Sequence, residues 1–166
     1  MQTPLQNALQ QLRLDGMISY IEAHPEDFEE LLQIAIGSED YAWNAAWLIH
    51  KTMNGNDPRL AGEHIDGIIE AATSKKRDGH QRELLKILFK IDLSETQEAV
   101  LFDACAGIWE QIHKQPGLRY TAFKMMMTIA RKYPDLLCEI RFFAQPHYLE
   151  TLSPGILHGL KKMLKF

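Results

Sequence analysis

The sequence has few residues that cross-link small proteins, and no long apolar run. Among its 166 residues are two cysteines, Cys105 and Cys138, which lie 33 positions apart. They form neither a disulfide framework nor a Cys-x-x-Cys motif, so we expect a reducing, cytoplasmic location. The apolar runs are too short to span a membrane, and the N-terminal residues show no secretory signal pattern. With 46% hydrophobic residues, the chain is expected to form one ordinary folded domain.

Motifs for catalysis and cofactor binding are also missing. The chain has no Gly-x-Ser-x-Gly elbow, no Walker loop and no Gly-x-Gly-x-x-Gly sequence. Glu110 and His113 have the Glu-x-x-His spacing of a di-iron site, but that site needs a second pair and two further carboxylates. A solvated helix end is the favoured interpretation of this pair, and core positions are favoured for both cysteines. We therefore expect no enzyme activity, no cofactor and no metal.

Strand signals are absent, and helical periodicity is present along the chain. No alternating β-branched run occurs. Apolar residues instead recur three and four positions apart, as in helices that bury one face. Such stripes begin at Ala45, Leu84, Ala122 and Leu157, at intervals of 39, 38 and 35 residues. A second helical pattern lies between each pair of stripes, and the third of these patterns runs from Leu136 to Phe143.

Local signals mark several helix ends. Ser94 and Gln97 have the spacing of a capping box, which begins a helix. Pro58 and Pro134 are each expected near the first turn of a second helix. The chain is expected to break at Asp15-Gly16, inside an otherwise helical pattern.

The repeating pairs predict an all-α protein, an α-α superhelix of about four to five antiparallel helix pairs. A four-helix bundle is the alternative, although it needs longer helices and no internal repeat. The expected domain is a single one, residues 1–166. Its predicted parts are capping helices at 1–38, helix-pair repeats at 39–77, 78–116 and 117–150, and a capping helix at 153–166.

Three segments carry a family resemblance: YAWNAAWLI at 41–49, RYTAFK at 119–124 and IARKYPDL at 129–136. They resemble helices of HEAT repeats, and the last is similar to small uncharacterised bacterial HEAT-like proteins. The resemblance covers residues 26–165 and implies a HEAT/ARM-like solenoid that acts as a scaffold, without catalytic residues. The layout also resembles the HEAT-like alkylpurine DNA glycosylases, but this chain is shorter and lacks their strongly basic concave face.

The net charge of −4 combines two opposite excesses. Residues 1–70 contain 12 acidic and 3 basic side chains, whereas residues 71–166 contain 10 acidic and 15 basic ones. In the HEAT resemblance, first helices line the convex side and second helices line the concave side. The resemblance therefore implies a basic outer face and an acidic inner groove. The basic residues of the first helices include Arg82, Lys86, Lys90, Arg119, Lys124, Arg131, Lys132, Lys161, Lys162 and Lys165.

The candidate interaction surface combines acidic, basic and aromatic residues, and its members are Trp43, Glu63, Asp66, Glu70, Lys75, Lys76, Arg77, Arg82 and Lys86. Another protein is the expected partner, bound through a basic or amphipathic segment in the acidic groove. A nucleic acid bound to the basic side or to the loop at 75–77 is the alternative, and an unrecognised enzyme is the third class. Ordinary solvated faces would also explain the charges. No membrane partner is expected, and the oligomeric state stays open.

Trp43 and the three consecutive methionines each allow either a packing role or a binding role. Trp43 is either a binding residue or a packing residue, since Trp is frequent at binding hot spots. Met125 and Met126 belong to a core stripe, so Met127 is the one candidate of the three methionines for an adaptable binding surface.

Overall fold

The computed structural model describes residues 1–74 and 77–165, and all regular elements in these ranges are helical. Lys75 and Lys76, two of the predicted site residues, therefore lie outside the described residues. The chain forms two compact units, Met1–Asp92 and Leu93–Phe166. The predicted all-α class is confirmed. The helices are shorter and more numerous than those of a simple four-helix bundle. The division of the chain into repeats stays a prediction.

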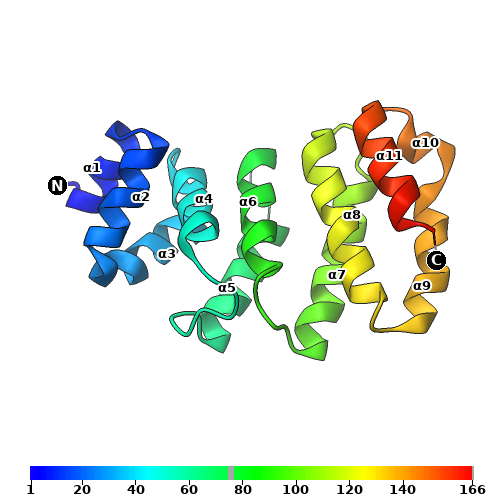
Figure 1. The fold of residues 1–166 in the computed structure, drawn as a ribbon, viewed down its shortest axis with the longest axis horizontal. Helices are drawn as coiled ribbons and strands as arrows, with labels where there is room; N and C mark the ends of the chain where they lie inside the picture. Colours follow the sequence, from blue (N-terminus) through cyan, green and yellow to red (C-terminus); the bar gives the residue numbers. More distant parts are fainter. Residues whose placement is uncertain (75–76, 166) are drawn as a thin grey trace. The chain divides into compact units, whose positions relative to one another are not determined.

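The first unit, coloured from blue to green in Figure 1, contains six α-helices among its described residues. A short 3₁₀ turn, η1, precedes the third helix. Their bounds are α1 Pro4–Gln11, α2 Leu14–Ala23, η1 Pro25–Asp27, α3 Phe28–Ile36, α4 Ala42–Thr52, α5 Gly62–Thr73 and α6 Asp78–Leu88.

These helices pack in two layers. Helix α4 contacts α2 on one side and α6 on the other, which makes one layer, and α3 contacts α5 in the second layer. The largest contacts between the layers join α3 to α4 and α5 to α6. This layered packing of consecutive helices is the arrangement of an α-solenoid.

Small residues allow α4 to lie inside this packing. Ala42, Ala45 and Ala46 are fully buried, together with Leu48 and Ile49. A side chain of one carbon lets the neighbouring helices approach closely, while the two larger residues fill the remaining space. The apolar stripe predicted from the sequence is thus the contact face of α4.

The second unit contains five α-helices and one 3₁₀ turn among its described residues. Their bounds are α7 Glu95–Glu110, α8 Pro116–Ala130, α9 Pro134–Ile140, η2 Arg141–Ala144, α10 Pro146–Leu149 and α11 Pro154–Met163. Helices α7 and α8 make the largest contact, and α9 and α11 both pack on α8. The capping box of Ser94 and Gln97 is present at the start of α7, as the sequence predicts.

An aromatic cluster forms the core of the second unit. Trp109 and Phe123 are fully buried, and their ring centroids are 4.7 Å apart. The indole Nε1 of Trp109 donates a hydrogen bond to the carbonyl of Phe143 at 2.8 Å. The ring therefore connects the α7–α8 pair to the short η2 turn.

Two predicted helix ends are wrong. Helix α2 runs through Asp15-Gly16, and the chain breaks at Leu12–Arg13 instead, because Asp15 in the first turn suits the positive end of the helix dipole. Helix α5 begins at Gly62 and not near Pro58. The intervening loop is fixed by Asn56, which has a φ of 50° and whose N–H donates to the Lys90 carbonyl at 2.8 Å.

Three core predictions concern the second unit. Cys105 is buried, as expected, and burial raises the pKa of its thiol. Cys138 is exposed, because α9 ends at Ile140 and buries that residue alone; its predicted core position is wrong. Met127 is also not a free surface residue, since α8 packs on several neighbours and all three of its methionines are buried.

Candidate protein-binding groove

Helix α5 separates its apolar side chains from its acidic ones. Ile65, Ile68, Ile69, Ala71 and Ala72 are buried, whereas Glu63, Asp66 and Glu70 are exposed. Glu63 and Glu70 are seven residues apart, which corresponds to two helical turns and about 10.5 Å along the axis. Two carboxylates therefore lie on nearly the same side of the helix.

Two adjoining hollows lie between α3 and α5, each with a volume of about 320 Å³. The first is lined by Glu29, Leu32, Gln33, Ile36, Glu63, His64 and Gly67. The second is lined by Ile36, Gly67, Glu70, Ala71 and Ser74. The two hollows adjoin at Ile36 and Gly67, which line both, and we call them together the α3/α5 groove.

The groove combines an apolar floor with acidic walls. Ile36 and Gly67 lie at its middle, where a Cβ atom added to Gly67 would meet only the Cδ1 of Ile36, at 3.7 Å. Glu29 and Glu63 line one end, and Glu70 lines the other. A groove with this lining suits a ligand with an apolar centre and positive charges at both ends.

Glu29 and His64 connect the two walls of the groove. The Nδ1 atom of His64 accepts the N–H of Ala61 at 3.2 Å, and its Nε2 atom lies 3.5 Å from Glu29 Oε2. Gln33 donates from Nε2 to Glu29 Oε1 at 3.2 Å. The carboxylate of Glu29 is therefore held in place while its side chain stays exposed.

The structure brings together only part of the predicted acidic set. Glu63 and Glu70 line the groove, but Asp66 lies outside both hollows. Sequence reasoning missed Glu29, Gln33 and His64, because the charge pattern selected only the acidic residues of α5 as the acidic part of the surface. The i, i+4 spacing of Glu29 and Gln33, on a helix of the same layer as α5, is the signal that could have identified them.

Trp43 does not belong to the groove. It lies in the first turn of α4 beside a separate hollow, and 42% of its surface is exposed. Its exposure agrees with a binding residue more than with a buried packing residue.

The predicted basic residues near the loop after α5 are only partly described. Arg77 donates from Nη2 to Asp40 Oδ1 at 2.6 Å, and both side chains are well exposed. An exposed ion pair of this kind contributes little stability. Lys75 and Lys76 lie outside the described residues, so their contribution to this surface stays a prediction.

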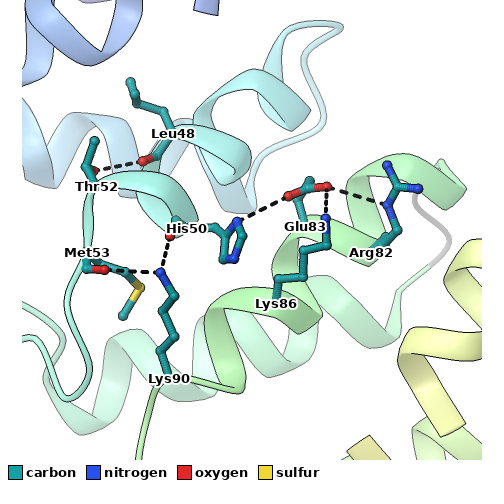
Figure 2. A network of polar contacts seen from close by, with 8 residues as sticks. All are labelled: Leu48, His50, Thr52, Met53, Arg82, Glu83, Lys86 and Lys90. Carbon is teal, nitrogen blue, oxygen red and sulfur yellow. Dashed lines mark hydrogen bonds and ion pairs between the residues drawn. The ribbon is translucent and has the colours of Figure 1, made fainter. Parts of the chain in front are cut away.

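Arg82 and Lys86 surround a buried carboxylate, that of Glu83, which is 3% exposed (Figure 2). Lys86 Nζ donates to Glu83 Oε1 at 2.9 Å, and Arg82 Nε lies 3.5 Å from the same oxygen. The other oxygen, Oε2, lies 3.7 Å from His50 Nδ1. The basic stripe predicted on α6 is therefore partly neutralised by its own helix.

The side chain of Lys90 extends the network of Figure 2 to the C-terminal end of α4. Lys90 donates to the carbonyls of His50 and Met53, the latter at 3.2 Å. Cations at a helix C-terminus satisfy its free carbonyls. Burial, and then the charge of Lys90, lower the pKa of His50, and Glu83 partly opposes this shift. We interpret the network as the contact that fixes α4 on α6.

The prediction that Arg119 belongs to a basic surface of the second unit is wrong. It is fully buried and not a surface residue, because its guanidinium reaches three acceptors: the carbonyl of Trp109 at 2.8 Å, the carbonyl of Tyr148 at 2.7 Å and the hydroxyl of Thr151 at 2.9 Å. The guanidinium carbon also lies 4.6 Å from the centre of the Trp109 ring. Burial lowers the pKa of Arg119, although a guanidinium stays charged at neutral pH.

Lys132, another predicted basic residue, is paired within the same unit. It forms an ion pair with the buried carboxylate of Glu98, to which the hydroxyl of Tyr133 donates at 2.6 Å. Burial alone would raise the pKa of Glu98, but the hydrogen bonds from Lys132 and Tyr133 lower it. The same contact raises the pKa of Tyr133 to about 12.

The described residues contain no group of three or more His, Cys, Asp or Glu side chains that could hold a metal ion. Glu110 ends α7 and His113 lies in the following turn, so the two residues do not share a helix. Within the described ranges, no helix is both long and apolar enough to cross a membrane.

Comparison with known proteins gives one match. The family model described as a HEAT repeat domain matches residues 1–166. No curated protein and no solved structure matches the chain.

Proposed function

This chain belongs to the HEAT repeat domain family, and we propose that it is a scaffold that binds a basic segment of another protein in the α3/α5 groove. Stacked helical repeats build extended binding surfaces. The observation that carries the proposal is the groove itself, where exposed carboxylates line both ends of an apolar floor. The proposal assigns the protein no catalytic step.

The spacing of the groove residues favours a helical ligand. Glu63 and Glu70 are two turns apart, with Gly67 between them. A partner helix that lies along α5 presents residues i and i+7 on one face at the same spacing of about 10.5 Å. Basic residues at those positions would face the carboxylates, and an apolar residue at i+4 would lie over Ile36 and Gly67. Such amphipathic helices commonly bind in grooves between other helices.

A nucleic acid is less well supported as the ligand, because many of the basic side chains already have internal partners. Arg82 and Lys86 pair with Glu83, Lys90 binds helix carbonyls, and Arg119 is buried. Phosphate groups require accessible cations along a surface. The acidic groove has the wrong sign for this ligand.

Binding of designed peptides tests the proposal directly. The probe is a labelled helical peptide with lysines at positions i and i+7 and leucine at i+4, and a peptide with glutamates at those two positions is its control. We expect the lysine peptide to bind in fluorescence anisotropy measurements, and added salt to weaken it. Glu63→Lys and Glu70→Lys should each weaken binding about tenfold, because like charges then face one another.

Asp66→Lys is the matched control, since it reverses a charge on the same helix outside both hollows. Gly67→Leu should block the groove. Gly67→Ala should raise the free energy of unfolding by up to about 1 kcal/mol through helix propensity, because the added methyl has space. If Asp66→Lys weakens binding as much as Glu63→Lys, or if Gly67→Leu binds as well as the wild type, the groove is not the site.

Capture from a lysate of the source cells identifies the natural partner. Wild-type protein and the Glu63→Lys/Glu70→Lys variant serve as paired baits, with nuclease treatment of half of each sample. The proposal predicts a protein that only the wild-type bait retains and that nuclease does not release. Retention of nucleic acid by both baits would support the alternative instead.

A further inference from the structure

A second hollow, lined mostly by apolar surface, lies where the α1–α2 connection meets the start of α4, within the first unit. Its volume is about 450 Å³. Three large apolar side chains surround it with unusually high exposure: Leu12 at 43%, Leu14 at 42% and Trp43 at 42%. Exposed apolar groups gathered at one place indicate an interaction surface.

The base of this hollow is firmly built. Met17 is buried beneath it, and Asn44 donates from Nδ2 to the carbonyl of Leu9 at 2.9 Å. This hydrogen bond joins the start of α4 to the end of α1. The exposed side chains are therefore presented by helix ends that are held against one another.

The charges at the edge of the hollow have opposite signs. Arg13 and Asp15 lie on either side of Leu14, and both are exposed. Among the residues that the structure describes, neither takes part in an ion pair. The edge of the hollow thus carries one cationic and one anionic side chain and no net charge, so a second copy of the same edge, turned about a two-fold axis, can place an opposite charge against each of them.

We propose that this surface, formed by Leu12, Arg13, Leu14, Asp15 and Trp43, joins two copies of the chain in a symmetric dimer. A two-fold interface brings the same patch of both copies together. Arg13 of each copy then faces Asp15 of the other, while Leu12, Leu14 and Trp43 pack around the axis. A basic or acidic ligand would leave one of the two edge charges facing its own sign, which favours a second copy as the occupant.

Sedimentation equilibrium over a wide range of protein concentration tests the dimer. The wild type should shift from the mass of one chain to that of two as concentration rises. Trp43→Ala should weaken association about thirtyfold or more, as a central aromatic residue does in an interface. A wild type that stays monomeric at every concentration would overturn the proposal.

Charge reversal tests the symmetry itself. Arg13→Glu alone places a glutamate against Asp15 of the other copy, and Asp15→Arg alone places an arginine against Arg13, so each variant should be monomeric. An equimolar mixture of the two variants restores opposite charges at both contacts of each mixed pair and should form a mixed dimer, which native mass spectrometry identifies by mass. Both positions are exposed, and circular dichroism of each variant checks its helix content, because Asp15→Arg also removes the acidic residue of the first turn of α2. If the mixture stays monomeric, or if each variant alone dimerises like the wild type, the proposed interface is wrong.

Discussion

Glu83 in the first unit and Arg119 in the second are both buried charges, but their surroundings differ. Glu83 is approached by cationic side chains, Lys86 at 2.9 Å and Arg82 at 3.5 Å, and by His50. Arg119 has no carboxylate among its hydrogen-bond partners within the described residues, which are two main-chain carbonyls and the hydroxyl of Thr151. The two units thus compensate charges of opposite sign with different groups.

Helix ends explain the difference. The carbonyl of Trp109 lies at the C-terminal end of α7, and that of Tyr148 lies in the short helix α10, where main-chain carbonyls lack helical partners and carry partial negative charge. The planar guanidinium can reach several such acceptors together. Glu83 lies in the middle of α6, so long flexible side chains must supply its positive partners. In both units, basic residues that the sequence predicts at the surface have partners within their own unit.

The largest expected effect follows from removing the guanidinium. Arg119→Ala should lower the free energy of unfolding of the second unit by about 4 kcal/mol, because it leaves a cavity and unpaired acceptors. Trp109 is the one tryptophan of residues 93–166, so its fluorescence during urea unfolding should report the loss. Arg119→Lys should lose less, since it keeps the charge but not the planar fork of donors. A loss below about 1 kcal/mol for Arg119→Ala would show that the carbonyls do not depend on the guanidinium.

Glu83 should show an intermediate effect. Glu83→Gln leaves Arg82 and Lys86 without their buried counter-charge, and we expect the first unit to lose about 2 kcal/mol. We expect a smaller loss than for Arg119 because the side chains of Arg82 and Lys86 are 40% and 34% exposed. Both cations can therefore turn toward water. Lys86→Met is the matched control and should cost less than about 1 kcal/mol. Equal losses for the two variants would contradict the central position of Glu83.

The smallest effect concerns the pH dependence of the first unit. Burial and Lys90 lower the pKa of His50 below its ordinary value of about 6.5, so the folded unit binds its proton less readily than the unfolded chain does. The free energy of unfolding of the first unit therefore keeps its full value above about pH 6.5, where His50 is neutral in both states. It decreases as the pH falls below 6.5 toward the folded-state pKa, because the unfolded chain binds the proton more readily. NMR titration of His50 should show the lowered pKa.

Two variants distinguish the causes of this shift. His50→Gln should remove the part of the pH dependence that begins near pH 6.5, as seen in denaturation midpoints. Glu83→Gln should lower the pKa of His50 further, because Glu83 favours the protonated imidazole. A rise in the pKa of His50 in Glu83→Gln would show that the two side chains do not interact as Figure 2 draws them.

Some of the fold and of the groove could be predicted from local sequence. The capping box at Ser94, the alanine stripe of α4 and the acidic face of α5 depend on residues three to seven positions apart, and the structure contains all of them. The helix boundary predicted near Pro58 was wrong because the loop before α5 is fixed by a contact between Asn56 and Lys90. That contact joins residues 34 positions apart and has no local signal.

The burial and pairing of charged side chains were harder to predict than helix formation. Lys86 and Arg119 have the same sign and both belong to the predicted basic face, yet one is half-buried beside a carboxylate and the other is fully buried on a tryptophan ring. Glu29 belongs to the groove only because α3 lies next to α5. The sequence gives the charge of each side chain, but the packing of the surrounding helices decides whether that side chain is accessible to a partner.

The sequence by itself determined the all-helical solenoid class, because helix formation and the spacing of apolar faces depend mainly on neighbours within two turns. It also determined that α5 carries acidic residues on its outer face. Only the tertiary structure decided that Glu63, Glu70 and Glu29 share a groove, that Glu83 and Arg119 are internal, and that Trp43 is exposed beside Leu12 and Leu14. The physical reason is that burial and desolvation depend on contacts between helices far apart in sequence, and periodicity along one helix carries no information about them.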